Sequence, residues 1–440
     1  MKVPTLRSGL FLYFCFMTIA QLYPLFLKFP DVCTDTRKIT ENCIFFALKG
    51  DNFNGNKYAD EAIEKGAAYA VVDEQEYVSQ DKIILVEDVL ACLQDLATYH
   101  RKKCPAKVIA LTGSNGKTTT KELIHAVLVK KYRTVATKGN LNNHIGVPLT
   151  LLSIAQDTAF AVVEMGANHQ KEIEFLCQIA QPDFGYITNF GKAHLEGFGS
   201  EEGVIIGKSE LYEYLIAHHK PIFLNADDAI QMKKLGAYVN KYGFTTHNKQ
   251  FYQIEFLGAL PWVHIKVEDF RIQTQLIGSY NFTNCCAAIL MGKYFNVSLS
   301  DIKEALEHYR PKNNRSQILQ KNGHYIILDA YNANPTSMEA ALVNFSTMEG
   351  TNKVAFLGDM FELGSSAMSE HMKVAKLAAD MRFDQTFLIG ENFCKTDTPL
   401  PHFNNVNALA TFLEQNPLQD STILIKGSRG MALEQILNLL

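Results

Sequence analysis

Short apolar runs alternate with helical segments through the middle of the chain. Residues 108–112 are predicted to form a strand, a glycine-containing turn follows, and residues 117–129 are predicted to form a helix. The same rhythm recurs at 160–164 and 184–189, where each apolar run ends at a polar or glycine-containing turn. This alternation is typical of parallel strands buried on both faces, so the middle of the chain is predicted to consist of βαβ units.

Two further α/β regions flank this one. The first carries apolar runs at 44–48, 69–72 and 83–86 and a predicted helix at 88–101. The last has predicted strands at 325–328, 354–357, 386–389 and 422–425. Both regions therefore repeat the strand-and-helix pattern of the middle.

The end of the middle region has a different composition. The segment 251–276 is rich in β-branched and aromatic residues and predicts a small antiparallel sheet. Helices are expected at about 281–294 and 299–309.

These patterns predict an α/β protein with three domains. We expect them at residues 17–103, 104–310 and 311–440, with a linker at 102–105. Substrates of such proteins bind in clefts at the carboxyl ends of strands and between domains.

The composition agrees with a packed protein and disfavours several classes. Of 440 residues, 47% are hydrophobic and 20% are charged, so a packed core is feasible. The formal net charge of −4 argues against a broad nucleic-acid-binding surface, which needs clustered lysine and arginine. The nine cysteines are scattered without a CxxC pair, which favours reduced thiols over a zinc ribbon or a disulfide framework.

The N-terminus allows two interpretations. Lys2 and Arg7 precede an apolar stretch at 9–20, which resembles a signal peptide but is too short for a membrane span and lacks an A-x-A cleavage site. We favour the other interpretation, in which residues 1–16 are an extension, Met17 is the natural start and the protein is cytoplasmic.

The strongest chemical pattern is the glycine turn between the first predicted strand and helix of the middle region. Its residues are Gly113, Ser114, Asn115, Gly116, Lys117, Thr118 and Thr119. In such a P-loop the backbone N–H groups face an anion, Lys117 supplies charge to the phosphates, and the Thr118 hydroxyl can reach magnesium. The full pattern has a glycine where Leu111 stands, and the alternative is a plain glycine turn with a solvated lysine. We expect a nucleotide-phosphate site with Lys117 exposed at the turn.

Three more residues are candidate magnesium ligands. Glu164 ends the strand predicted at 160–164, and a carboxylate at the carboxyl end of a strand beside the P-loop strand suits a hard cation. His194 and Lys208 are weaker candidates on local pattern, because isolated histidines are usually structural and most lysines are solvated.

The segments that carry Glu164, His194 and Lys208 follow the P-loop in this order. Together they resemble the Mur ligase superfamily, whose members build the peptide of the bacterial wall precursor. The resemblance runs from about residue 17 to the C-terminus. Further matching motifs are GNLNN at 139–143, GVP at 146–148, AHLEGFGS at 193–200, YNANP at 331–335, GDMFELG at 358–364 and KGSRG at 426–430. The resemblance implies a central P-loop ATPase-like parallel sheet, an N-terminal UDP-sugar-binding domain and a C-terminal Rossmann-like domain.

The resemblance also implies roles for the catalytic candidates. Glu164 and His194 would hold magnesium, with two ions in the site, beside ATP. Lys208 falls where the family carries a carbamylated lysine, in which CO₂ turns a neutral amine into an anionic oxygen ligand. This makes chemical sense, because an ammonium beside Mg²⁺ would be repelled.

Nucleotide contacts follow by the same resemblance. Asn281 and Asn284 would face the adenine, although Tyr280 stands where the family often has histidine. Arg315 would contact phosphate and Asp329 the ribose, which are suitable chemical types for these roles.

Substrate contacts are implied in both flanking regions and beside the P-loop. The N-terminal candidates are Thr34, Asp35, Thr36, Arg37 and Lys49. The others are Asn140, Asn142, Asn143, Asn332 and Asn334. His144 stands where many relatives have aspartate, which affects how the third residue of the substrate peptide is contacted but not the reaction.

Within the family, the motifs look most like those of members that join UDP-N-acetylmuramoyl-tripeptide to D-alanyl-D-alanine with hydrolysis of ATP. The enzyme is expected to act as a monomer. A related ligase that extends folate with glutamate is one alternative, disfavoured by the UDP-like first domain and by the YNANP segment. A P-loop regulator or kinase and an inactive binding scaffold are the others. Whether the third residue is diaminopimelate or lysine is left open.

Overall fold

The computed structural model describes residues 16–440, so the extension predicted at 1–16 lies outside the described residues except for Phe16. The chain divides into two compact units. One comprises the residues up to Cys104 together with Leu151–Ser153, and the other comprises Pro105–Thr150 and Ile154–Leu440. The domain boundaries predicted at 103/104 and 310/311 stay predictions. None of the helices in the part of the chain described is long and apolar enough to cross a membrane.

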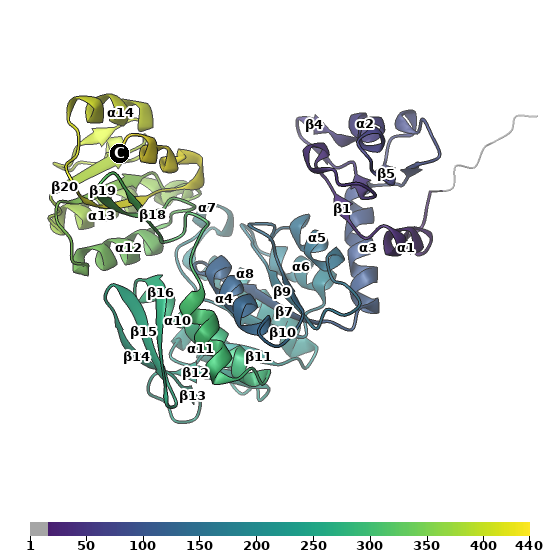
Figure 1. Ribbon diagram of the computed structural model, residues 1–440, viewed down its shortest axis with the longest axis horizontal. Helices are drawn as coiled ribbons and strands as arrows, with labels where there is room; N and C mark the ends of the chain where they lie inside the picture. The colour runs from purple at the N-terminus through teal and green to yellow at the C-terminus, as the bar shows by residue number, and fades with distance from the viewer. Residues whose placement is uncertain (1–15) are drawn as a thin grey trace, which may run out of the picture. The chain divides into compact units, whose positions relative to one another are not determined.

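The N-terminal unit contains a parallel sheet with the strand order β1-β2-β5-β6 (Figure 1). These strands are β1 (Val32–Cys33), β2 (Ile44–Phe46), β5 (Tyr69–Val72) and β6 (Ile83–Leu85), accompanied by a small hairpin of β3 (Lys49–Gly50) and β4 (Phe53–Asn54). Its helices are α1 (Ile19–Lys28), α2 (Ala59–Glu64) and α3 (Val89–Lys103). The helix predicted at 88–101 is α3. The side chain of Asp88 caps it by accepting from the Ala91 N–H, and Leu93, Leu96 and Ala97 are buried.

The second unit begins with a seven-stranded parallel sheet of order β13-β12-β11-β10-β7-β9-β8. Its strands are β7 (Lys107–Thr112), β8 (Thr134–Ala136), β9 (Phe160–Glu164), β10 (Phe184–Ile187), β11 (Ile222–Asn225), β12 (Lys241–Thr245) and β13 (Tyr252–Gln253). From β7 the chain forms β8 and then β9 on one side of that strand and crosses to β10 on the other side, so the strand order reverses at β7. A crevice at the carboxyl ends of the strands is expected there.

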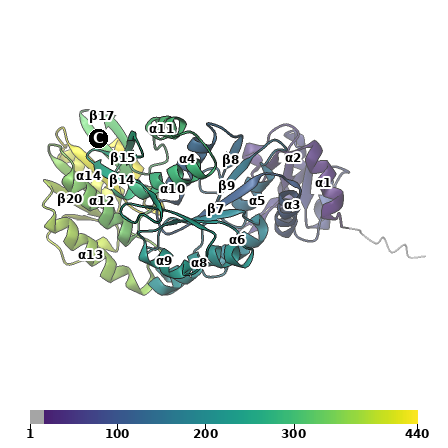
Figure 2. The same ribbon diagram turned by 90° about the horizontal axis from the view of Figure 1, so that it is seen from below.

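Helices cover both faces of this sheet. Figure 2 shows α4 (Lys117–Leu128), α10 (Tyr280–Tyr294) and α11 (Leu299–His308) on one face. On the other lie α6 (Glu172–Ala180), α8 (Glu201–Ala217) and α9 (Ala229–Leu235). The part of the second unit that carries this sheet is called its first half below. Its remaining helices are α5 (Gly146–Leu152) and α7 (Leu195–Phe198).

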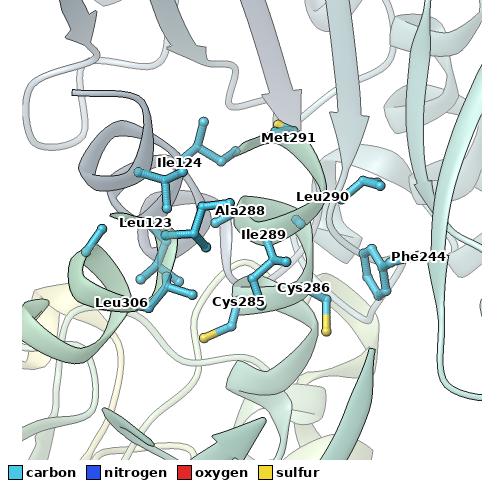
Figure 3. Packing of buried hydrophobic residues seen from close by; sticks show 14 of the residues in the cluster. Leu123, Ile124, Phe244, Cys285, Cys286, Ala288, Ile289, Leu290, Met291 and Leu306 are labelled. Carbon is cyan, nitrogen blue, oxygen red and sulfur yellow. The ribbon is translucent and has the colours of Figure 1, made fainter. Parts of the chain in front are cut away.

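A large hydrophobic core lies around α10, which is buried along nearly its whole length. In Figure 3, Leu123 and Ile124 of α4 and Leu306 of α11 lie beside α10, and Phe244 of β12 lies near its other side. This packing holds α4, and therefore the turn before it, rigidly against the sheet.

The predicted antiparallel sheet is confirmed with one correction. It comprises β14 (Glu255–Ala259), β15 (Trp262–Val267) and β16 (Phe270–Ile277). The start of the predicted segment instead forms β13, which pairs in parallel with β12 at the edge of the large sheet. A two-residue edge strand has too few alternating positions for its partner to be read from the sequence.

The C-terminal half carries a six-stranded sheet of order β17-β18-β22-β19-β20-β21, parallel except for β17. Its strands are β17 (Gln317–Lys321), β18 (His324–Asp329), β19 (Lys353–Gly358), β20 (Gln385–Ile389), β21 (His402–Phe403) and β22 (Thr422–Lys426). Its helices are α12 (Pro335–Thr347), α13 (Ala367–Asp380) and α14 (Val406–Gln415). Asn334 caps α12 with Pro335 in the first turn, which explains the asparagine-proline pair in this motif.

A buried carboxylate fixes the turn after β19. Asp359 is 2% exposed and accepts the backbone N–H groups of Asn392 at 2.9 Å and Phe393 at 3.0 Å. The Asp359→Ala variant is expected to lower the free energy of unfolding by about 3 kcal/mol, because both donors lose a charged acceptor. Urea unfolding followed by far-UV circular dichroism measures the change. Asp397→Ala, an exposed aspartate, is the control, and superimposable curves for the two variants would contradict the expectation.

Candidate active site

A cavity of about 880 Å³ lies at the carboxyl end of β7, where the strand order reverses. Residues from both halves of the second unit line it, including Lys117, Glu164 and His194 from the first half and Arg315 and Asp329 from the second. The cavity therefore gathers residues that the sequence singled out for phosphate, metal and ribose contacts.

The glycines of the P-loop turn are required by its geometry. Gly113 has a φ of +141°, and a Cβ there would lie 2.0 Å from Oγ1 of Thr188. Gly116 has a φ of +80°, and a Cβ there would lie 2.6 Å from Oδ1 of Asn284. Since no side chain caps the start of α4, its first N–H groups remain available for an anion.

The segment that follows β10 supports this turn. The Asn115 N–H donates to Oδ1 of Asn189 at 3.0 Å, and the Asn115 carbonyl accepts from the Thr188 hydroxyl at 2.6 Å. Ser114 adds a hydrogen bond to the Gly191 carbonyl at 2.9 Å. Thr188 and Asn189 were not among the sequence candidates, although their place at the end of a neighbouring parallel strand could have indicated them.

Lys117 is not exposed, contrary to the sequence prediction. Its ammonium group folds back and donates to the carbonyls of Gly113 at 2.7 Å and Ser114 at 3.3 Å. Burial lowers its pKa to about 8, while the Glu164 carboxylate acts in the opposite direction and Arg315 lowers it further. The lysine was expected in solvent because the sequence does not show that Glu164 and Arg315 surround the turn.

Glu164 ends β9 and is 1% exposed. Its carboxylate accepts from the Thr118 hydroxyl at 3.0 and 3.2 Å and from the Asn142 side chain at 2.8 Å. The ammonium of Lys121, itself 2% exposed, lies 3.7 Å from it and donates to the Gly139 carbonyl at 3.2 Å. Lys121 was not a sequence candidate, because nothing in the neighbouring sequence distinguishes it from a solvated lysine on a helix.

His194 lines the same cavity from the first position before α7, where it adopts a φ of +54°. Its Nδ1 lies 2.5 Å from the carboxylate of Glu362, which belongs to the segment after β19. Glu362 appeared in the sequence only as part of a motif and was not a site candidate.

Lys208 is fully buried on α8 and is not among the residues that line the cavity. Its ammonium donates to the Ala167 carbonyl at 2.9 Å and lies 4.9 Å from the centre of the Phe198 ring. Burial holds its pKa well below the usual range, and the charge of Lys117 lowers it further. The structure thus brings Thr118, Glu164 and His194 to the cavity and places Lys208 behind its wall, next to the lining residue Ala167.

The predicted adenine contacts form a buried amide pair. Asn284 donates to Oδ1 of Asn281 at 2.8 Å and accepts from the Thr120 hydroxyl at 3.0 Å. The adjacent Tyr280 hydroxyl lies 2.9 Å from that of Ser316, and burial raises the Tyr280 pKa. Tyr280 therefore lines the cavity as an aromatic wall.

The C-terminal half adds cations. The Arg315 guanidinium stacks 3.7 Å from the centre of the Tyr331 ring, and among the described residues its buried Nε has no hydrogen-bond acceptor. Asp329 accepts from Lys426 at 2.7 Å. Lys426 is 1% exposed and also lines the cavity, yet the sequence marked it only as a motif residue.

The predicted substrate asparagines all line the cavity, but four of them have structural partners as well. Asn142 holds Glu164, Asn143 accepts from the Gly146 N–H at 2.9 Å, and Asn334 donates to Oδ1 of Asn115 at 2.8 Å. Asn332 accepts from the Ala333 N–H at 2.9 Å through its Oδ1. Asn140 and His144 line the cavity as well.

The predicted N-terminal contacts belong to the other unit, and none of them lines this cavity. Arg37 donates two hydrogen bonds of 2.9 Å to Asp35, which lowers the Asp35 pKa to about 2. Lys49 lies 3.0 Å from Asp73. Thr34 and Thr36 flank the Asp35 turn.

Comparison with known proteins identifies the family. The Mur ligase family catalytic domain matches residues 30–104, the Mur ligase middle domain matches 111–292, and the Mur ligase glutamate ligase domain matches 314–429. The UDP-N-acetylmuramoyl-tripeptide–D-alanyl-D-alanine ligase of Bacillus subtilis is 34% identical over 423 residues, which cover 92% of each chain. The chain belongs to the Mur ligase family. It is accordingly an ATP-dependent amide-bond-forming ligase.

Two further relatives agree with this membership. The Escherichia coli ligase of the same name is 33% identical, with 93% of each chain covered. A crystal structure of MurF from Acinetobacter baumannii superposes with a TM-score of 0.82 at 30% identity, covering 93% of this chain and 92% of the other. The predicted α/β architecture, with its central parallel sheet, is thereby confirmed as that of a Mur ligase.

Proposed function

We propose that this Mur ligase joins D-alanyl-D-alanine to the terminal carboxylate of UDP-N-acetylmuramoyl-tripeptide and converts ATP to ADP and phosphate. The observation that carries the proposal is the single cavity in which the P-loop turn, the Glu164 carboxylate and the Arg315 guanidinium converge. Relatives named for this reaction match over more than nine tenths of the chain. Because ATP is the co-substrate, we propose that the enzyme works in the cytoplasm, and that it does so as a monomer.

The proposed reaction activates a poor electrophile. An oxygen of the tripeptide carboxylate attacks the γ-phosphorus of ATP, the bond to the β-phosphate oxygen breaks, and an acyl phosphate and ADP form. The amine of D-alanyl-D-alanine then attacks the acyl carbon, loses a proton, and displaces phosphate. Lys117, Arg315 and the N–H groups at the start of α4 would bind the phosphates and align them with the carboxylate.

The donor set fits a magnesium ion. Glu164 and Thr118 present a buried carboxylate and a hydroxyl within 3.2 Å of each other, and both are hard oxygen donors. His194 would add a nitrogen donor. Among residues 16–440 no group of three His, Cys, Asp or Glu side chains is close enough to hold a metal alone, so nucleotide oxygens and water would complete the coordination. When bound, magnesium neutralises charge on the transferred phosphate.

Carbamylation of Lys208 and a second magnesium ion are part of the proposal. Burial keeps the Lys208 pKa low, which favours the neutral amine, and only the neutral amine combines with CO₂. The carbamate would supply the anionic oxygen that an ammonium cannot.

A substrate panel tests the proposed reaction. ADP release should require both a UDP-linked tripeptide and D-alanyl-D-alanine, and mass spectrometry should detect the amide product. Supplying tripeptides that end in diaminopimelate or in lysine identifies the third residue. ATP turnover without an amine acceptor would favour a kinase or regulator, and glutamate addition to a folate would favour the other ligase branch.

Because the pKa of Lys117 is low, we expect the protein to take up a proton when ATP binds above pH 8. With a pKa of about 8, roughly three quarters of the free protein would carry neutral Lys117 at pH 8.5, and the phosphates would restore its charge. Calorimetry in two buffers of different ionisation enthalpy should show uptake of roughly 0.7 proton at pH 8.5. Lys117→Arg, which stays protonated, should abolish the uptake. Equal heats in both buffers for the unaltered protein would refute the prediction.

A further inference from the structure

The contact between His194 and Glu362 joins the two halves of the second unit. His194 precedes α7 in the first half, whereas Glu362 follows β19 in the second, 168 positions along the chain. The Glu196 N–H also donates to the Glu362 carbonyl at 3.1 Å. Side chain and backbone of Glu362 therefore both meet the loop that carries His194.

The segment that presents Glu362 is anchored within its own half. The Phe361 N–H donates to the Ser428 hydroxyl at 2.9 Å, and the Met360 N–H donates to Nε2 of His371 at 3.0 Å. The preceding residue, Asp359, holds two backbone N–H groups through its buried carboxylate. Three consecutive residues are thus fixed before Glu362, so its carboxylate is offered in a defined position.

We propose that Glu362 is a positioning residue that aims His194 at the metal site. Its carboxylate accepts the proton on Nδ1, which fixes the tautomer and leaves Nε2 as the nitrogen with a lone pair for a cation. Since His194 lines the cavity and Glu362 does not, the carboxylate acts through the imidazole. This inference rests on the proposed role of His194 as a metal ligand.

The arrangement has a second consequence. The orienting carboxylate comes from the C-terminal half, so the metal affinity of the first half depends on how the C-terminal half is docked. By reciprocity, metal binding favours the docked arrangement. Glu362 therefore links the assembly of the ATP site to metal binding.

The test measures metal binding directly on the full chain. Mn²⁺ is titrated into the ADP complex and free ion is followed by electron paramagnetic resonance, with Glu362→Gln, Glu362→Ala and His194→Ala as variants. Glu362→Ala is expected to weaken Mn²⁺ binding about tenfold, and Glu362→Gln by less, because the amide oxygen can still accept from Nδ1. ADP affinity without metal should be unchanged. In the ligase assay, the Mg²⁺ concentration at half-maximal rate should rise for Glu362→Gln while kcat at saturating Mg²⁺ is retained.

Two controls separate positioning from docking. Glu370→Gln removes a carboxylate 3.4 Å from Lys192 at the same junction without touching His194. Glu414→Gln alters an exposed residue of α14. Glu414→Gln should bind Mn²⁺ as the unaltered protein does, and Glu370→Gln should weaken binding far less than Glu362→Ala. If Glu370→Gln weakens Mn²⁺ binding as much as Glu362→Ala, docking alone is responsible and the positioning role is overturned.

The remaining outcomes distinguish this inference from the proposed function. Weakened binding in His194→Ala together with unaltered binding in Glu362→Ala overturns the inference and leaves the metal role of His194 intact. Unaltered binding in His194→Ala overturns that metal role, and the inference with it. Neither result affects the substrate panel, which tests the reaction itself.

Discussion

Replacing Lys117 by alanine is expected to lower kcat by about a thousandfold or more while the fold stays intact. The ammonium group is the cation that the P-loop turn carries, and the transferred phosphate gains stabilisation from it where water is excluded. Its hydrogen bonds go to the turn carbonyls of Gly113 and Ser114. Steady-state ADP release at saturating substrates measures the loss.

Stability should not fall with activity in this variant. Burial lowers the Lys117 pKa to about 8, below its value in the unfolded chain. At pH 7 the lysine is charged in both states, and burying that charge in the folded state lowers the free energy of unfolding. Removing the charge at pH 7 should leave the thermal midpoint unchanged or slightly raised. Lys107→Ala is the matched control, because this exposed lysine begins the same strand, β7, at the opposite end from the turn. Turnover by Lys117→Ala within tenfold of the unaltered enzyme would rule out the proposed role.

Replacing Lys208 by alanine is expected to reduce turnover by about a hundredfold or more and to create a site that small carboxylates can occupy. The side chain is fully buried with its amine beside the Ala167 carbonyl, so its removal leaves a space next to the cavity wall. Acetate or formate could there replace the anionic oxygens of a carbamate. Partial recovery that saturates with carboxylate concentration is the expected result.

Two variants make this result specific. Lys208→Met keeps most of the volume without an amine, so it should be inactive and respond weakly to carboxylates. Lys233→Ala, an exposed lysine of α9, should keep full activity. Full activity of Lys208→Ala would refute the role of Lys208. So would lost activity that no carboxylate restores in a variant with an unaltered circular dichroism spectrum.

Local sequence determined the elements that carry the site. The run at 160–164 became β9 with the predicted bounds, and the predicted helix after the glycine turn became α4, which ends one residue earlier than expected. These elements follow from the periodicity of neighbouring residues and from glycine conformations, both of which are local properties. The P-loop and Glu164 could therefore be found without coordinates, because parallel strands bring their carboxyl ends to one edge.

Tertiary structure alone decided which groups surround those residues. Lys121 meets Glu164, Lys426 pairs with Asp329 across 97 positions, and Glu362 reaches His194 across 168. No spacing in the chain encodes these pairs, since they depend on the order of strands in two sheets and on the packing of the two halves. The same holds for the environment of Lys117 and Lys208, because burial and neighbouring charge set a lysine's pKa, and both arise only when distant segments come together. Residue types thus defined the chemistry available to this ligase, whereas folding determined the protonation and orientation of its groups.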